Sequence, residues 1–109
     1  MKILKFLLII TFTFLLNNLI SFADEAKMVK GLEIFNETAG CAACHVLKAA
    51  GSEGNIGPNL DTVEGLNYDS VMDIVTHGLG VMPAFGEDEI LTKDEIDIVS
   101  FYVSNSVGK

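Results

Sequence analysis

The two cysteines constrain the fold of this chain more than any other feature, because both stand in one C-x-x-C-H motif at residues 41–45. A C-x-x-C pair alone is compatible with a disulfide, a thioredoxin-like redox pair or half of a zinc site. A closed zinc site needs four ligands, and only His77 offers a further imidazole or thiolate, while no convincing strand supports a thioredoxin fold. The histidine after the second cysteine is the signature of c-type haem attachment, in which two thiols add to the porphyrin vinyl groups and the imidazole reaches the iron. The motif predicts one haem c, attached through Cys41 and Cys44, with His45 beside the iron.

The first 23 residues predict a secretory signal peptide. Two lysines within the first five residues precede an apolar run of 11 residues at 6–16. Small residues then stand at Ser21 and Ala23, where a signal peptidase requires them, just before Asp24. The alternative is an uncleaved membrane anchor, since the apolar stretch reaches about the 18-residue minimum for a span, but two consecutive asparagines inside it disfavour this. We expect export to the periplasm of a bacterial source.

With residues 1–23 as the signal peptide, the remaining domain, residues 24–109, is strongly acidic. The whole chain has seven basic and 15 acidic residues, a formal charge of −8; removal of the signal peptide takes two lysines and leaves −10. Nucleic-acid binding depends on Lys and Arg that neutralise phosphates, so this balance excludes nucleic acid as a partner. It also disfavours anionic membrane surfaces. We expect redox protein partners with a basic docking surface, attracted at low salt.

Met82 is the candidate for a second iron ligand. Of the three methionines after the first residue, Met28 and Met72 fall in helical apolar patterns, which predicts core positions for both. Met82 lies instead in a glycine-rich loop at residues 78–83, directly before a proline, so its thioether is not committed to a helix face. His77 is the alternative ligand, and a bis-histidine iron would have a lower potential. Its place at the end of a predicted helix favours a capping or solvent-facing role instead.

Apolar residues at helical spacing predict three helices, with no periodic element between residues 46 and 67. The first helix contains Gly31, which costs on the order of 1 kcal/mol relative to alanine, so another helix is expected to approach closely there. The second begins near residues 67–69 and ends at Gly78, and the third opens with a capping box at Thr92–Glu95. The expected apolar faces comprise Met28, Gly31, Leu32 and Phe35 in the first helix, and Ile96, Ile98, Val99, Phe101, Tyr102 and Val103 in the last.

Together these features resemble the small class I c-type cytochromes over almost all of residues 27–105. The motifs that carry the resemblance are, in order, Gly31-x-x-x-Phe35, Cys41-Ala42-Ala43-Cys44-His45, Gly57-Pro58-Asn59-Leu60, Met82-Pro83-Ala84-Phe85 and Phe101-Tyr102. The resemblance implies an all-α, class I cytochrome c fold, with three to four short helices and long loops wrapped around one covalently attached haem. It also implies that the first and last helices cross at Gly31, with Phe35 and Tyr102 in the contact. The irregular stretch would then wrap the haem. The haem would also enlarge the hydrophobic core, which in a domain of 86 residues is marginal without a cofactor.

The resemblance further implies the roles of three site residues. His45 would be the proximal and Met82 the distal iron ligand, and the Pro58 carbonyl would accept the other imidazole N–H of His45. Two axial ligands leave no vacancy for a substrate, so the expected activity is one-electron transfer and not enzymatic catalysis. We therefore expect an exported, monomeric monohaem cytochrome that carries single electrons between periplasmic redox partners and has no small-molecule substrate.

Two alternative functions remain at this point. The chain could be a dedicated haem electron-transfer subunit of a periplasmic dehydrogenase, which co-purification with an enzyme would reveal. It could also be a reactive or gas-binding haem protein in which Met82 detaches. The early position of the C-x-x-C-H motif disfavours the gas-binding helical-bundle cytochromes, and the absence of arginine excludes a peroxidase site with a distal arginine.

Overall fold

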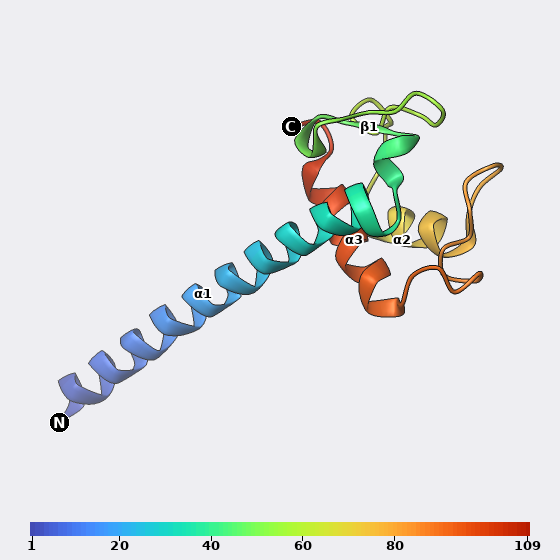
Figure 1. Ribbon diagram of the computed structural model, residues 1–109. Helices are drawn as coiled ribbons and strands as arrows, with labels where there is room; N and C mark the ends of the chain where they lie inside the picture. Colours follow the sequence, from blue (N-terminus) through green and yellow to red (C-terminus); the bar gives the residue numbers. More distant parts are fainter.

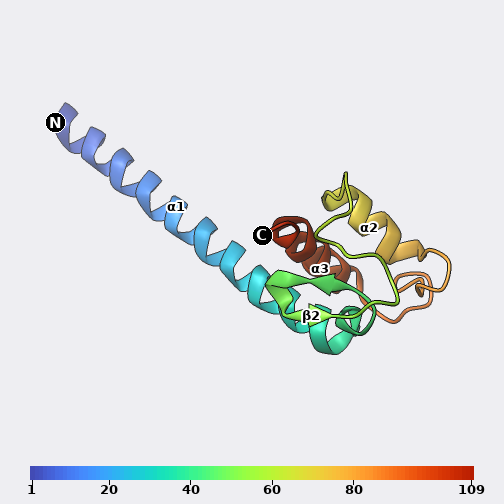
Figure 2. The same cartoon turned by 90° about the horizontal axis from the view of Figure 1, so that it is seen from above.

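A long helix and a small helical domain make up the computed structural model, which describes residues 1–109. The helix α1 extends from the domain like a rod, α3 packs against its far end, and α2 packs against α3 (Figure 1). Between these helices the chain follows turns, short helices and one small antiparallel strand pair (Figure 2). The elements in chain order are α1 (Lys2–Glu33), the π-helix η1 (Ile34–Thr38), the 3₁₀-helix η2 (Cys41–Ala43), β1 (Val46–Leu47), the 3₁₀-helix η3 (Lys48–Ala50), β2 (Ser52–Glu53), α2 (Tyr68–His77) and α3 (Lys93–Ser106). The expected helical architecture, with helices joined by long loops, is thus present.

The first helix is longer than the short helix expected from the sequence. It runs without a break from Lys2 to Glu33, through the apolar segment and past Asp24. Polar side chains in the apolar segment bond back to the helix itself: Thr13 Oγ1 donates to the Ile9 carbonyl at 2.7 Å, and Asn18 Nδ2 to the Phe14 carbonyl at 2.9 Å. These bonds satisfy the polar groups locally, so two asparagines do not end the helix. By length and composition the helix could cross a membrane, a property that signal sequences share.

The last turns of α1 cross α3 at Gly31. A β-carbon on Gly31 would lie 2.2 Å from Tyr102 Cβ, so only glycine allows the two helix backbones to come this close. Phe35 packs on the other side of the contact, with its ring centroid 6.1 Å from that of Tyr102. The crossing and its three residues are therefore as expected. Leu32, predicted on the same face, is instead about one-third exposed, because one residue step turns it about 100° away from the point of closest approach.

Both predicted helix starts are confirmed. Asn67 caps α2 by accepting a hydrogen bond from the Ser70 amide at 3.0 Å, and the Ser70 hydroxyl accepts one from the Asn67 amide. Thr92 and Glu95 form the same reciprocal pair at the start of α3. Gly78 ends α2 with a φ of 74°, in the region that favours glycine.

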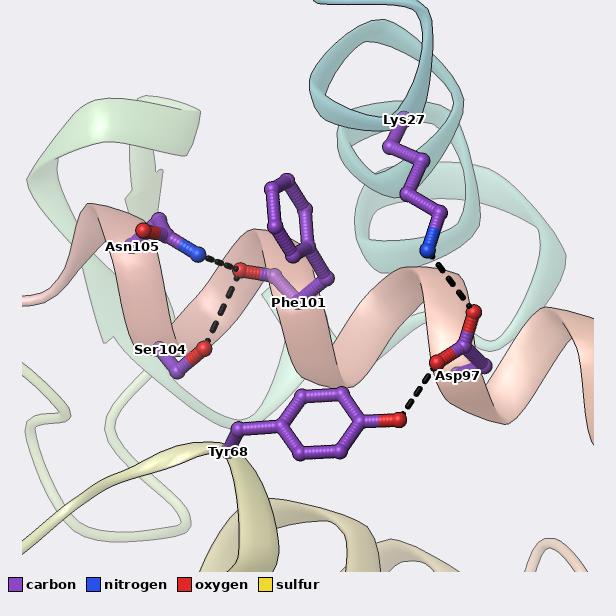
Figure 3. A network of polar contacts seen from close by, with 6 residues as sticks. All are labelled: Lys27, Tyr68, Asp97, Phe101, Ser104 and Asn105. Atoms are coloured by element: carbon purple, nitrogen blue, oxygen red, sulfur yellow. Dashed lines mark hydrogen bonds and ion pairs between the residues drawn. The ribbon is translucent and has the colours of Figure 1, made fainter. Parts of the chain in front are cut away.

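A polar network joins the three helices on the side of α3 shown in Figure 3. Lys27 of α1 approaches Asp97 of α3 with an Nζ–Oδ2 distance of 3.1 Å, and the Tyr68 hydroxyl of α2 donates to the other carboxylate oxygen. The Lys27 ammonium also lies 5.3 Å from the centroid of the Phe101 ring. The hydrogen bond to Asp97, followed by burial, raises the pKa of Tyr68 to about 12. Asp97 thus links the end of α1 to both other helices.

The segment after the C-x-x-C-H motif contains a small strand pair that the sequence analysis did not predict. Val46 pairs with Glu53 and Leu47 with Ser52, in antiparallel register. The Ser52 hydroxyl accepts from the Leu47 amide at 2.9 Å and donates to the His45 carbonyl at 2.8 Å. Two-residue strands are too short to show an apolar alternation, so this pair leaves no periodic signal in the sequence.

Candidate functional site

The cysteines lie in a short turn directly after the first helix. Gly40, with a φ of 70°, reverses the chain, and η2 then carries Cys41 while Cys44 follows its last residue. The two cysteines form no disulfide with each other, and both are half-buried. Burial raises the pKa of the Cys41 thiol to about 11, so this thiol is protonated at neutral pH. The turn presents the two thiols and the following imidazole, that of His45, within five residues.

The imidazole of His45 is held in a defined orientation by a backbone carbonyl. Its Nδ1 lies 2.7 Å from the Pro58 carbonyl oxygen. Because a carbonyl oxygen can only accept, Nδ1 carries the proton, and Nε2 keeps its lone pair. An imidazole whose Nδ1–H is bonded to a carbonyl and whose Nε2 is unprotonated has the arrangement typical of a metal-ligating histidine.

Two backbone hydrogen bonds place Pro58 opposite this imidazole. The Gly57 amide donates to the Cys44 carbonyl at 2.8 Å, and the Leu60 amide donates to the Val46 carbonyl at 3.0 Å, so residues 57–60 run beside the motif. Gly57 itself lies against the His45 ring, where a β-carbon would be 2.5 Å from Cε1. Glycine is therefore required at this position by the imidazole next to it.

Met82 is carried by a tight turn in the loop after α2. The Met82 amide donates to the Leu79 carbonyl at 3.0 Å, and the Leu79 amide donates back to the Met82 carbonyl at 3.2 Å. Gly78 lies so close to this turn that a β-carbon there would be 2.7 Å from the Met82 carbonyl oxygen. The thioether is half-buried and packs against the edge of the core, on a backbone that belongs to no helix.

These residues fit a covalently bound haem. Two thiols can attach the porphyrin, and an imidazole with a free Nε2 and a thioether are the iron ligands of His/Met cytochromes c; the missing side chain at Gly57 leaves room for the His45 ring. The helices bury a core of only 11 hydrophobic residues, whereas large apolar side chains in the loops remain exposed. Ile56 is 70% exposed and Val81 91% exposed, which an apolar cofactor between the loops would explain.

The alternative ligand, His77, is engaged in a different contact. Its Nδ1 lies 2.5 Å from Glu87 Oε1, and its side chain is more than half exposed. This partner was not predictable from local sequence patterns, and neither was the role of Ser52 beside His45. Gly57 was a detectable signal, because glycine is the residue used where the backbone must approach another group closely.

Comparison with known proteins identifies the family of the chain. Residues 26–103 match the family model described as "Cytochrome C oxidase, cbb3-type, subunit III". The chain is 34% identical over 94 residues to cytochrome c6 of Gloeothece citriformis (strain PCC 7424), covering 82% of this chain and 78% of that protein. It is 38% identical over 96 residues to the cbb3-type cytochrome c oxidase subunit CcoP of Azospirillum sp. (strain B510), covering 75% of this chain. The chain spans only 31% of the length of CcoP.

A solved structure extends the agreement to the fold. The c-type cytochrome SorU from Sinorhizobium meliloti superimposes with a TM-score of 0.71 and 45% identity, over 78% of this chain and 95% of that one. The helical fold and the C-x-x-C-H site define a small monohaem c-type cytochrome of class I. The chain belongs to the cytochrome c family whose model it matches, and it holds one haem c through Cys41 and Cys44 and transfers electrons.

Proposed function

We propose that this chain is an exported one-electron carrier in which His45 and Met82 are the two axial ligands of the haem iron. The observation that carries the proposal is the His45–Pro58 hydrogen bond, because it leaves Nε2 as the nitrogen available to the iron. The Met82 turn supplies the second donor from a loop, as the proposal requires. Haem c supplies the reversible ferric/ferrous couple when it is bound.

The chain's own residues set the conditions for this couple. The Pro58 carbonyl fixes the tautomer and the plane of the His45 ring, and its hydrogen bond makes the imidazole a stronger donor. A thioether from Met82 is a soft ligand and raises the potential relative to a second imidazole. With both axial positions filled, no position is left for a substrate, which supports an electron carrier without enzymatic activity.

The N-terminal segment supports export. Residues 1–23 combine early lysines, an apolar run and small residues before Asp24, and in α1 they are exposed and apolar. We propose that signal peptidase removes them and that residues 24–109 work in the periplasm. An uncleaved α1 would instead tether the domain to the membrane, and the mass of the purified chain distinguishes the two forms.

The charge of the domain supports a basic partner. Residues 24–109 have a formal charge of −10, and three consecutive acidic residues, Glu87, Asp88 and Glu89, follow the Met82 loop. Association with a basic redox partner should therefore slow as ionic strength rises, because salt screens charges separated by more than about 10 Å at 0.1 M. A rate that is flat with salt would contradict this part of the proposal.

Replacement of Met82 by histidine tests the ligand assignment. The Met82→His variant is expected to have a midpoint potential lower by on the order of 0.1 V, within the roughly 0.8 V span that axial ligands cover in haem proteins. The measurement is a potentiometric titration of both proteins. Met72→His, on α2, is the matched control and should leave the potential near that of the wild type. An unchanged potential in Met82→His would show that Met82 is not bound to the iron.

A further inference from the structure

The loop that carries Met82 is closed at its base against the end of α2. The Phe85 amide donates to the Val75 carbonyl at 2.9 Å, and the amides of Gly86 and Glu87 donate to the Thr76 carbonyl at 3.2 and 3.1 Å. Residues 78–84 therefore leave α2 and return to the same place. The geometry of the turn depends on how firmly this base stays closed.

One side-chain contact joins the two ends of the loop. His77 is the last residue of α2, and Glu87 lies where the loop returns to α2; their Nδ1 and Oε1 atoms lie 2.5 Å apart. The other ring nitrogen of His77 lies 3.7 Å from Asp73 Oδ1, one turn earlier in α2. Two further charges face the pair: Asp88 borders the same surface hollow as His77, and Lys93, at the start of α3, borders an adjoining hollow with Glu87.

We propose that the His77–Glu87 pair is a clasp that positions Met82, with Glu87 acting through His77 and the closed loop on the thioether; this rests on the proposed function of Met82 as an iron ligand. The pair spans the loop at its base, so its loss releases an ion-pair contact between the two ends. Met82 lies in the loop between the two residues and borders the same surface hollow as His77, so an opening of the base would move its backbone.

The effect of the clasp is expected to be local. Both side chains are more than half exposed, and an exposed ion pair contributes little to the free energy of unfolding of a whole domain. Loops open on their own, at lower free energy than global unfolding, and the clasp acts on that local opening. The suitable readout is therefore displacement of Met82 from the iron and not thermal stability.

The charge state of His77 gives the clasp a pH dependence. The hydrogen bond to Glu87 raises the pKa of His77 above its ordinary value; desolvation opposes this, and the charges of Glu87 and Asp73 add to the increase. A raised pKa means that the charged pair is complete below the ordinary histidine value of about 6.5 and weakens as pH rises through the raised value. The clasp is thus firmest at mildly acidic pH and weakens as the pH rises.

Competition by imidazole for the Met82 position tests the proposal. The ferric holoprotein is titrated with imidazole, and loss of the weak far-red iron–thioether band is followed in the wild type, Glu87→Gln and Glu89→Gln. Glu89 is a matched control because it is exposed, lies two residues further on and makes no ion pair. Comparison of the proteins at equal pH cancels the protonation of imidazole itself.

At pH 6, Glu87→Gln should bind imidazole about threefold more tightly than the wild type, a size in keeping with one exposed ion pair. Glu89→Gln should match the wild type, and the difference for Glu87→Gln should shrink as the pH rises to 10. The double variant His77→Gln, Glu87→Gln should bind imidazole no more tightly than Glu87→Gln alone.

The proposal is overturned if Glu87→Gln binds imidazole like the wild type at pH 6, if Glu89→Gln shows the same gain, or if the gain does not depend on pH. A further additive gain in the double variant would also overturn it, because the two residues would then act separately. A wild-type protein without the far-red band would instead refute Met82 ligation, and so the proposed function itself.

Discussion

Alanine in place of Gly31 should destabilise the domain, although alanine is the better helix former. The added β-carbon would lie 2.2 Å from Tyr102 Cβ, 2.9 Å from Tyr102 Cγ and 3.1 Å from the Ile98 carbonyl oxygen. Ordinary carbon–carbon contacts are about 3.5–4.0 Å, so the two helices must separate by roughly 1.5 Å. Tyr102 Cβ and the Ile98 carbonyl oxygen are fixed by the α3 backbone, so rotation of a side chain cannot relieve these two contacts.

The net effect follows from two opposing terms. Overpacking costs about 1–3 kcal/mol, and the upper end applies here because both sides of the contact are helix backbone. The gain in helix propensity from Gly to Ala is about 1 kcal/mol. We expect a net loss of about 2 kcal/mol, which for a domain of this size lowers the Tm by roughly 8–16 °C.

Thermal unfolding of the holoprotein, followed by far-ultraviolet circular dichroism, measures this change. Val29→Ala is the matched control, since Val29 lies on the same helix, is 70% exposed and also gains helix propensity on replacement. Its Tm should equal or exceed that of the wild type. A Gly31→Ala variant with an unchanged or raised Tm would refute the close crossing of α1 and α3.

Two further predictions concern contacts beside the helices and the site. The hydrogen bond to Asp97 raises the pKa of Tyr68 to about 12, so the neutral phenol contributes stability that is complete below the ordinary pKa of about 10 and is lost as the pH rises through 12. Asp97→Asn should bring the Tyr68 pKa back toward 10, as measured by NMR titration. A wild-type Tyr68 that titrates near 10 would contradict the network. Gly57→Ala places a β-carbon 2.5 Å from His45 Cε1, so the ring must tilt away from Pro58. The yield of low-spin holoprotein per milligram of chain should therefore fall several-fold. A yield and a spectrum like those of the wild type would contradict a His45 ring held at this place.

The sequence predicted those features of the fold that depend on a residue type with a specific local role, such as a helix cap or a glycine at a helix crossing. Asn67 and Thr92 were identifiable because a capping side chain serves amides two or three residues away, within reach of local pattern analysis. Gly31 was identifiable because a glycine on an apolar helix face implies a close neighbour, and the resemblance to a family supplied that neighbour, Tyr102.

Contacts between residues far apart in the chain left no such signal. Lys27, Tyr68 and Asp97 are ordinary surface residues in their own segments, and only the crossing of three helices brings them together. The same holds for His77 and Glu87, whose pairing depends on the return of the Met82 loop to α2. The unbroken α1 was missed for another reason, because a cleavage pattern in the sequence does not require a break in the helix.

The optical spectrum of the holoprotein tests the central claim, that His45 and Met82 hold the iron from both sides, most directly. Spectra of the oxidised and reduced protein are recorded before and after carbon monoxide is added. The account predicts a low-spin spectrum with the weak far-red ferric iron–thioether band and no response to carbon monoxide. A high-spin spectrum, or a reduced spectrum that carbon monoxide changes, would mean an open iron position and would contradict it.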